Sequence, residues 1–269
     1  MTSISTVASN AYVNTTNKLS QTYGQISSGK RINSAADNPA GLVVSTNFNT
    51  QVSASQQAQR NGLDAKSLIE TEDSALAQIS QGLERLQELS VQQGNGILND
   101  TDRAALASEA SQITEQINQV IEQSAFNGKN LFQSESSAQN VNFQLGDKAG
   151  DLVSLPANVT ASPIQAGLQQ LELNNPNSAG ASLTTLDSIQ QVVNERRSEL
   201  GAANNRIDSS IEQLSEEEIQ TQSSLSRVED ADIAKLVSEM VVEQVKQQAQ
   251  LAVQSQGNAS AEDTLRLLS

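Results

Sequence analysis

The stretch that decides the fold runs from Leu186 to Val228 and reads LDSIQQVVNERRSELGAANNRIDSSIEQLSEEEIQTQSSLSRV. Every seventh residue from Leu186 onward is apolar, with Thr221 as the exception. No proline interrupts the stretch, and its only glycine is Gly201. A sustained seven-residue apolar repeat predicts a long helix that packs along a narrow seam, as in coiled coils and long bundles. At ~1.5 Å per residue, such a helix would be roughly 65 Å long.

The composition also favours long thin helices over a thick globular core. The chain has 269 residues, of which 2% are aromatic and none is tryptophan. Leu, Ile, Val and Phe together make up only about a quarter of it, close to the level found in disordered chains. Large aromatic side chains supply much of the burial in ordinary cores. We therefore expect partner molecules to complete the core of each protomer.

The charge balance and the missing residue types exclude several classes of function. The formal net charge is −15, which disfavours nucleic acids and anionic membrane surfaces as partners. There is no cysteine and no histidine, so disulfides, thiol nucleophiles and histidine chemistry are ruled out. We find no apolar run long enough to span a membrane and no Sec signal peptide at the N-terminus.

The periodicity outside the heptad stretch predicts further helices. Residues 3–28 form a weakly apolar amphipathic pattern, and residues 27–42, broken by Gly29 and Pro39, form a connector. Helical periodicity resumes over residues 43–95, and a third helix follows an N-cap near Asn99 and ends at Ser124. The last helical pattern starts at Ile233, and we expect residues 256–260 to break it.

The region of residues 129–180 has a different character. Residues 141–145 alternate apolar and polar side chains, residues 146–150 are rich in turn formers, and residues 152–155 form a second short strand. This pattern predicts a β-hairpin, with a short helix around residues 165–171. The predicted fold class is therefore mainly α: a long antiparallel helical bundle or coiled coil with a small β-hairpin insertion.

Several stretches, spread over nearly the whole chain, resemble bacterial flagellin. They are residues 27–42 (SSGKRINSAADNPAGL), 86–92 (LQELSVQ), 126–131 (FNGKNL), 197–202 (RSELGA), 226–232 (SRVEDAD), 247–249 (QQA) and 267–268 (LL). Only about 50 residues separate the two matching halves, so the resemblance implies a short form without the family's variable outer domains. The segment before Ser27 is several residues shorter than the family pattern.

The resemblance implies two domains. Residues 1–34 and 229–269 would form an inner core domain of paired terminal helices, disordered in the monomer, and residues 35–228 a three-helix rod forming the outer tube, with its β-hairpin region at about 129–180. The residues expected in the self-assembly core are Ile4, Val7, Ala11, Leu19, Ile26, Ile233, Val237, Met240, Val245, Leu251, Leu267 and Leu268. Those expected in the rod seam are Ile69, Leu76, Leu83, Ile113, Ile117, Val193, Leu200, Ile207 and Leu214.

The implied function is that of a structural subunit that assembles into the helical flagellar filament for motility. The implied partners are other copies of the chain, a cytoplasmic export chaperone, and cap and hook-associated proteins, with type III export and no cleaved Sec signal peptide. We expect no catalytic residues, cofactor or metal, and neither nucleic-acid binding nor membrane insertion. In related flagellins, the positions of Arg85, Leu89 and Glu109 form a patch bound by a vertebrate innate immune receptor, and here the patch could equally serve packing between protofilaments.

Competing interpretations rest on weaker patterns. Residues 24–30 spell a P-loop as far as Lys30, but Arg31 replaces the Ser or Thr that would bind the metal, and a helical pattern precedes them. Acidic residues 216–218 and 229–232 lack the glycine-centred spacing of a calcium loop. The arginines at 196, 197 and 206 are expected to form exposed pairs with carboxylates. A hook–filament junction protein, which shares the terminal helices, remains the alternative function, and an enzyme is the least favoured.

Overall fold

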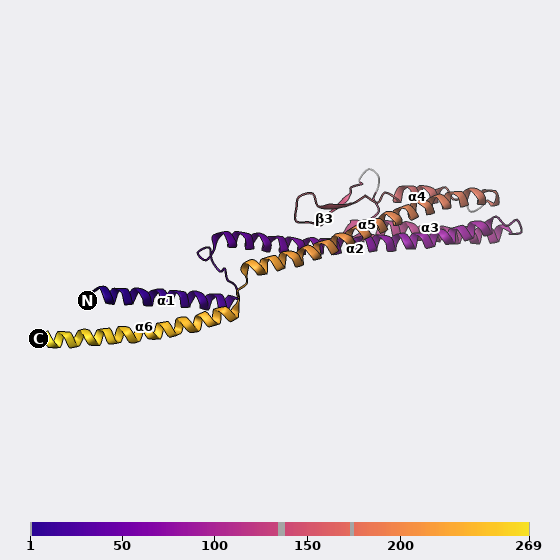
Figure 1. Ribbon diagram of the computed structural model, residues 1–269. Helices are drawn as coiled ribbons and strands as arrows, with labels where there is room; N and C mark the ends of the chain where they lie inside the picture. Colours follow the sequence, from indigo (N-terminus) through magenta and orange to yellow (C-terminus); the bar gives the residue numbers. More distant parts are fainter. Residues whose placement is uncertain (1, 134–137, 173–174, 269) are drawn as a thin grey trace. The chain divides into compact units, whose positions relative to one another are not determined.

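The computed structural model describes the backbone of residues 2–133, 138–172 and 175–268, and the side chains of residues 9–133, 138–172, 175 and 177–260. Helices dominate these residues (Figure 1). The helices are α1 (Thr2–Ser28), α2 (Pro39–Gln93), α3 (Asp100–Gln123), α4 (Ala161–Gln169), α5 (Ala179–Glu229) and α6 (Ile233–Leu268), with a 3-10 turn at Pro176–Ser178. The predicted fold class, mainly α with a small β insertion, is confirmed.

Local sequence signals fix where the helices begin and end. Asn38 precedes Pro39, the first residue of α2, and the Asn38 side-chain oxygen accepts a hydrogen bond from the Gly41 N–H at 2.9 Å. Asn99 caps α3 in a capping box with Asp102, in which each side chain accepts from the other residue's backbone N–H. Gly29, with a φ of +71°, follows α1 in the left-handed conformation that ends many helices.

Two antiparallel hairpins lie between α3 and α4. Strand β3 (Val141–Gln144) pairs with β4 (Leu152–Leu155), as the alternating pattern predicts. The sequence analysis missed the pair β1 (Ala125–Phe126) and β2 (Lys129–Asn130), treating this region only as a helix end. Its turn residues, Asn127 and Gly128, both have positive φ, and Asn-Gly is the strongest short hairpin signal.

The chain divides into two compact units, which we describe separately. One comprises residues up to Ser53 together with those from Glu218 onward, and the other is Ala54–Glu217. The domain boundaries implied by the resemblance, at residues 34/35 and 228/229, lie in the connector before α2 and next to the last residue of α5. The division into compact units falls inside both helices.

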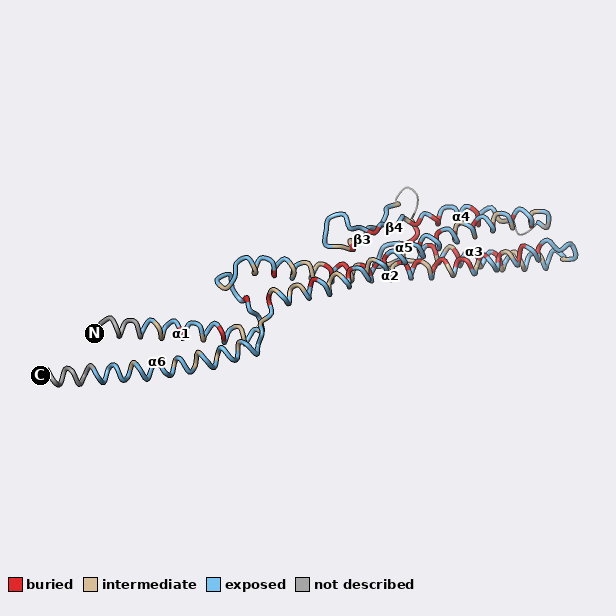
Figure 2. The backbone as a smooth tube through the Cα atoms, in the orientation of Figure 1, coloured by how far each residue is buried: buried red, intermediate tan, exposed pale blue. Residues whose placement is uncertain are grey.

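The larger unit, Ala54–Glu217, has a continuous apolar core between α2, α3 and α5 (Figure 2). Of the seam residues expected there, Ile113 is partly buried and the others are buried: Ile69, Leu76, Leu83, Ile117, Val193, Leu200, Ile207 and Leu214. Helix α4 packs closely on α5 at Gly167, where an added Cβ would lie 2.6 Å from Ile189 Cδ1. Aliphatic side chains repeated along the helices thus fill most of the core of a chain that has few aromatic residues.

The structure corrects one boundary in the smaller unit. The sequence analysis expected residues 256–260 to break the last helix, but α6 continues through them to Leu268. A single glycine, Gly257, costs a helix only about 1 kcal/mol relative to alanine, and no proline is present to stop it. Within the part of the chain that the structure describes, none of the helices has the length and apolar character needed to cross a membrane.

Candidate assembly surface on the terminal helices

Helices α1 and α6 lie side by side and antiparallel in the smaller unit (Figure 1). Two side-chain hydrogen bonds join them: the Gln244 amide donates to the Tyr23 hydroxyl at 2.8 Å, and the Gln247 amide donates to the Thr16 hydroxyl at 3.3 Å. Both bonds are exposed to solvent, so each contributes little net stability. The pairing must therefore depend mainly on the seam between the helices.

That seam is narrow and is made partly of small polar residues. On α1, Thr15 and Thr22 are buried and lie about two helical turns apart. Their hydroxyls donate to backbone carbonyls of their own helix, at Ala11 and Lys18 respectively, so neither of these two hydroxyls is left without a partner. The apolar part of each buried threonine side chain is a single methyl group. Methyl groups bury far less apolar area than leucine side chains, so the pair gains little stability from this contact.

Much of the described part of these two helices is exposed (Figure 2), and the exposed residues include large apolar side chains. They are Val13 and Tyr23 on α1, and Ile233, Val237, Val241, Val242, Val245, Leu251 and Val253 on α6. The α6 residues are distributed around the helix rather than along one stripe, so a single neighbouring helix cannot cover all of them. An exposed apolar surface of this extent marks an interaction site rather than a solvated face.

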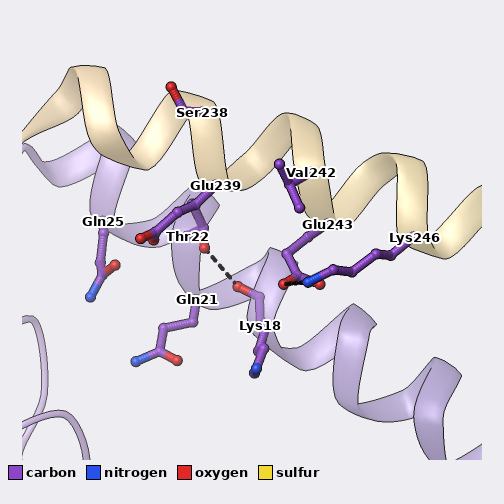
Figure 3. Close-up of a pocket in the computed structure, with 9 residues that line it drawn as sticks. All are labelled: Lys18, Gln21, Thr22, Gln25, Ser238, Glu239, Val242, Glu243 and Lys246. Atoms are coloured by element: carbon purple, nitrogen blue, oxygen red, sulfur yellow. Dashed lines mark hydrogen bonds and ion pairs between the residues drawn. The ribbon is translucent and has the colours of Figure 1, made fainter.

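A groove of about 570 Å³ runs between α1 and α6 (Figure 3). It is lined by Lys18, Gln21, Thr22, Gln25, Ser238, Glu239, Val242, Glu243 and Lys246. Eight of its nine lining residues are polar or charged, and Lys246 forms an ion pair with Glu243 at 2.9 Å within α6. The groove is therefore suited to polar contacts with protein and lacks a built catalytic constellation.

The connectors at the base of this helix pair are joined by an antiparallel backbone bridge, which we call the clasp and define as residues 29–31 with residues 228–231. The Arg31 N–H donates to the Glu229 carbonyl at 2.6 Å, and the Ala231 N–H donates to the Gly29 carbonyl at 3.0 Å. Lys30 forms an ion pair with the largely buried Glu229 carboxylate. The clasp brings the end of α1 and the start of α6 together.

Asp37 stabilises the connector that leads from the clasp to α2. Its carboxylate accepts hydrogen bonds from the Asn33 and Ser34 backbone N–H groups, from the Ser34 hydroxyl and, at 2.7 Å, from the Gln21 amide. These donors, led by the Asn33 N–H, lower the pKa of Asp37 below its ordinary value of 3.8. The hydrogen bond to Gln21 also ties the connector to α1.

The comparisons with known proteins agree with this arrangement over both ends of the chain. The family model for the bacterial flagellin N-terminal helical region matches residues 2–137, and that for the C-terminal helical region matches residues 183–268. The chain belongs to the bacterial flagellin family. A flagellin from Halalkalibacterium halodurans is 33% identical over 91% of this chain and 89% of the relative. A 30.7 kDa flagellar filament core protein from Treponema maltophilum is 31% identical over 91% and 90%.

A solved structure also supports the assignment. The crystal structure of Bacillus cereus flagellin matches with a TM-score of 0.53 and 32% identity over 58% of this chain and 88% of that chain. The present chain is a short flagellin without variable outer domains, since only its residues 138–182 separate the two matched regions. It is a structural subunit of the flagellar filament, outside the cell, and not an enzyme. The hook-associated alternative has less support, because both matching models describe flagellin.

The structure places the residues predicted for the flagellin self-assembly core in two groups. Ala11, Leu19, Ile26 and Met240 are partly covered between α1 and α6, whereas Ile233, Val237, Val245 and Leu251 are exposed. The side chains of Ile4, Val7, Leu267 and Leu268 lie outside the described residues. The described members are thus divided between the intramolecular seam and the uncovered surface.

The predicted receptor patch requires a correction. Arg85 and Glu109 do lie together on the surface, joined by hydrogen bonds of 2.9 and 2.5 Å from Nε and Nη2 of Arg85. Leu89, however, is only 1% exposed. Although Leu89 lies one helical turn from Arg85, it belongs to the apolar stripe that continues from Leu86 into the core. Leu89 is therefore not part of an exposed patch in this conformation.

The expectation that Arg196 forms an exposed ion pair is also wrong. Its side chain is 3% exposed and forms an ion pair with Glu72, which is 2% exposed, at 2.7 Å. A signal for this pair was present in the sequence, because Arg196 lies seven residues after the buried Ile189 and Glu72 lies seven residues before the buried Ile79. Two opposite charges at core positions of two heptad helices indicate a buried pair.

Proposed function

We propose that α1 and α6 are the part of the subunit that joins neighbouring subunits in the filament, forming its inner core, and that the Ala54–Glu217 unit forms the surrounding tube. The observation that carries this proposal is the exposed apolar surface of α6. Because α1 covers only one side of α6, residues such as Val241 and Val245 would be buried by helices of other subunits. This burial would offset the entropy lost when the ends are ordered.

The thin seam between the terminal helices supports a second part of the proposal. With small residues such as Thr15 and Thr22 buried on α1, the helix pair would gain too little from its own burial to stay folded in the free subunit. The pair would then order fully only when neighbouring subunits add their surfaces. A subunit that stays unfolded at its ends, and has no disulfide, is also suited to export through a narrow channel.

Seeded polymerisation of the purified subunit tests the assembly role. Val241→Asp places an unpaired carboxylate on the exposed apolar surface, and its burial between subunits would cost several kcal/mol. We expect Val241→Asp to reduce filament growth from sheared seeds at least about tenfold, whereas Val241→Ile should grow like the wild type. Because Val241 is exposed in the isolated chain, the melting temperature should not change. Wild-type growth by Val241→Asp would contradict the role of this surface.

The same assay tests the junction alternative. A filament subunit adds repeatedly to seeds, so filament length should increase with the amount of added protein. A hook–filament junction protein would bind at filament ends and stop there. Binding without elongation would therefore favour the alternative function and would be visible in the same electron micrographs.

We further propose that an export chaperone covers the region from Met240 to the C-terminus before assembly. The exposed Val241, Val242 and Val245 would otherwise present an apolar surface in the cytoplasm, where it favours aggregation. Cap and hook-associated proteins would contact the assembled ends of the same terminal helices. Recognition by a vertebrate innate immune receptor would have to use Arg85 and Glu109, because Leu89 is buried.

A further inference from the structure

The buried ion pair in the Ala54–Glu217 unit has a partner beyond the two helices that supply it. Arg196 on α5 donates from Nε to Glu72 on α2 at 2.7 Å. Its Nη2 donates to the carbonyl of Pro156 at 3.0 Å, in the segment that follows strand β4. Its Nη1 donates to the Glu199 carboxylate at 3.0 Å. One guanidinium therefore connects two helices and the base of the β3–β4 hairpin.

The segment that receives this hydrogen bond is itself buried and well connected. Asn158 and Thr160 are buried, and the Asn158 side-chain oxygen accepts from both the Thr160 N–H, at 3.0 Å, and the Thr160 hydroxyl, at 2.6 Å. The Asn158 carbonyl accepts from the Gln133 N–H at 2.8 Å. These bonds shape the segment locally, and the hydrogen bond from Arg196 attaches it to the helices.

Helix packing alone does not account for a buried charge pair at this position. Removing two charges from water is costly, and buried ion pairs are often replaced by apolar side chains of similar volume without loss of stability. Glu72 and Arg196 occupy core positions of a seam in which the neighbouring residues Ile69 and Val193 are apolar. What an apolar pair cannot do is donate a hydrogen bond to the Pro156 carbonyl.

We propose that Arg196 is a positioning residue, held in place by Glu72, that fixes the segment Pro156–Thr160 and with it the base of the β3–β4 hairpin on α2 and α5. Arginine is suited to this role because its planar fork can donate to several acceptors at once, and lysine cannot reproduce that geometry. Without the guanidinium, the hairpin would keep its own backbone pairing, the apolar contacts of Val153 and Leu155 and the hydrogen bond from the Asn61 amide to the Gln144 carbonyl, and it would lose the anchor at Pro156. This inference does not depend on the proposed roles of the terminal helices.

The neighbouring residue supplies a matched control. Arg197 on α5 pairs with Asp73 on α2, each one residue further along its helix, with Nε donating at 2.8 Å. This second pair joins the same two helices, but it is 40% and 43% exposed, and the hydrogen bonds of Arg197 in the described part of the chain go to Asp73 and not to the hairpin segment. Changing it should affect the α2–α5 contact slightly and leave the hairpin unaffected.

Amide hydrogen exchange tests the proposal on the full-length protein. In the double variant Glu72→Leu/Arg196→Met, we expect the amides of α2 and α5 to keep their protection and the melting temperature to stay within a few degrees of the wild type. The amides of Val141–Gln144 and Leu152–Leu155 should exchange at least about tenfold faster, the change expected for losing one charge-assisted hydrogen bond. The control Asp73→Leu/Arg197→Met should leave hairpin exchange unchanged.

A second variant keeps the test decisive if the double variant does not fold. Arg196→Lys retains the positive charge next to Glu72 but loses the planar guanidinium that donates to the Pro156 carbonyl. It should therefore produce the same increase in amide exchange in the hairpin, while the amides of the helices stay protected. Hairpin exchange at the wild-type rate in Arg196→Lys would overturn the proposal. An equal increase in exchange over the helices and the hairpin would also overturn it, since that result would reflect general destabilisation.

Discussion

Glu72 shows how burial and pairing compete at a single residue. Burial raises the pKa of its carboxyl above the ordinary value of 4.5, and this outweighs the opposing effect of the Arg196 guanidinium, while Glu199 adds to the increase. The folded state therefore holds a proton that the unfolded state releases at the ordinary pKa. Stability from this group is present at low pH and is lost as pH rises from 4.5 through the raised pKa.

The variant Glu72→Gln isolates this effect, because glutamine keeps an oxygen acceptor for Arg196 and cannot titrate. The stability of the wild type relative to Glu72→Gln should fall as the pH is raised from 4.5 to 7, which thermal unfolding of both proteins at each pH would measure. Glu72→Leu removes the buried carboxylate, leaves the arginine only the Glu199 carboxylate and the Pro156 carbonyl as acceptors, and should cost about 3 kcal/mol over the whole range. A pH-independent difference between the wild type and Glu72→Gln would contradict the raised pKa.

At the scale of single helices, the long seams were the most predictable part of the fold. The heptad repeat of α5 and the periodicity of α2 and α3 follow directly from which side chains can be buried together. The short β1–β2 hairpin could not be predicted from periodicity, because two-residue strands carry none, so only the Asn127-Gly128 turn could reveal it. The burial of Arg196 follows from its position in the heptad and not from its residue type, which favours the surface.

The seam of α5 can be tested at a fully buried position. Ile207 is 0% exposed, so Ile207→Asp removes apolar contacts and buries an unpaired carboxylate, at a cost of several kcal/mol. Since domains are typically stable by only about 5–15 kcal/mol, most of the larger unit should unfold. Asn205→Asp introduces the same side chain at an exposed position two residues away and should melt like the wild type. Circular dichroism melting curves that coincide for all three proteins would refute the core assignment.

At the scale of the whole chain, the two units differ in how completely they bury their own apolar side chains. The Ala54–Glu217 unit encloses a continuous core, whereas α1 and α6 leave most of their large apolar residues uncovered over the part of each helix whose side chains the structure describes. The order of elements and the resemblance of both ends to flagellin could be recognised from the sequence. The sequence does not indicate which apolar residues of α6 face α1 and which face outward. These residues occur all around the helix, so they define no preferred face.

This difference predicts that the terminal helices can be removed without unfolding the larger unit. Deletion of residues 1–28, or of residues 240–269, should leave the cooperative melting of the three-helix core within a few degrees of the wild type, because the residues of that core lie between Ala65 and Ile207. The same deletions should abolish growth on seeds, because association with neighbouring subunits through the exposed apolar surface requires both terminal helices. Melting followed by circular dichroism and filament growth followed by electron microscopy measure the two effects on one preparation. Filaments that still grow from both deleted proteins would show that neighbouring subunits associate through the larger unit, and loss of the melting transition would show that the two units fold only together.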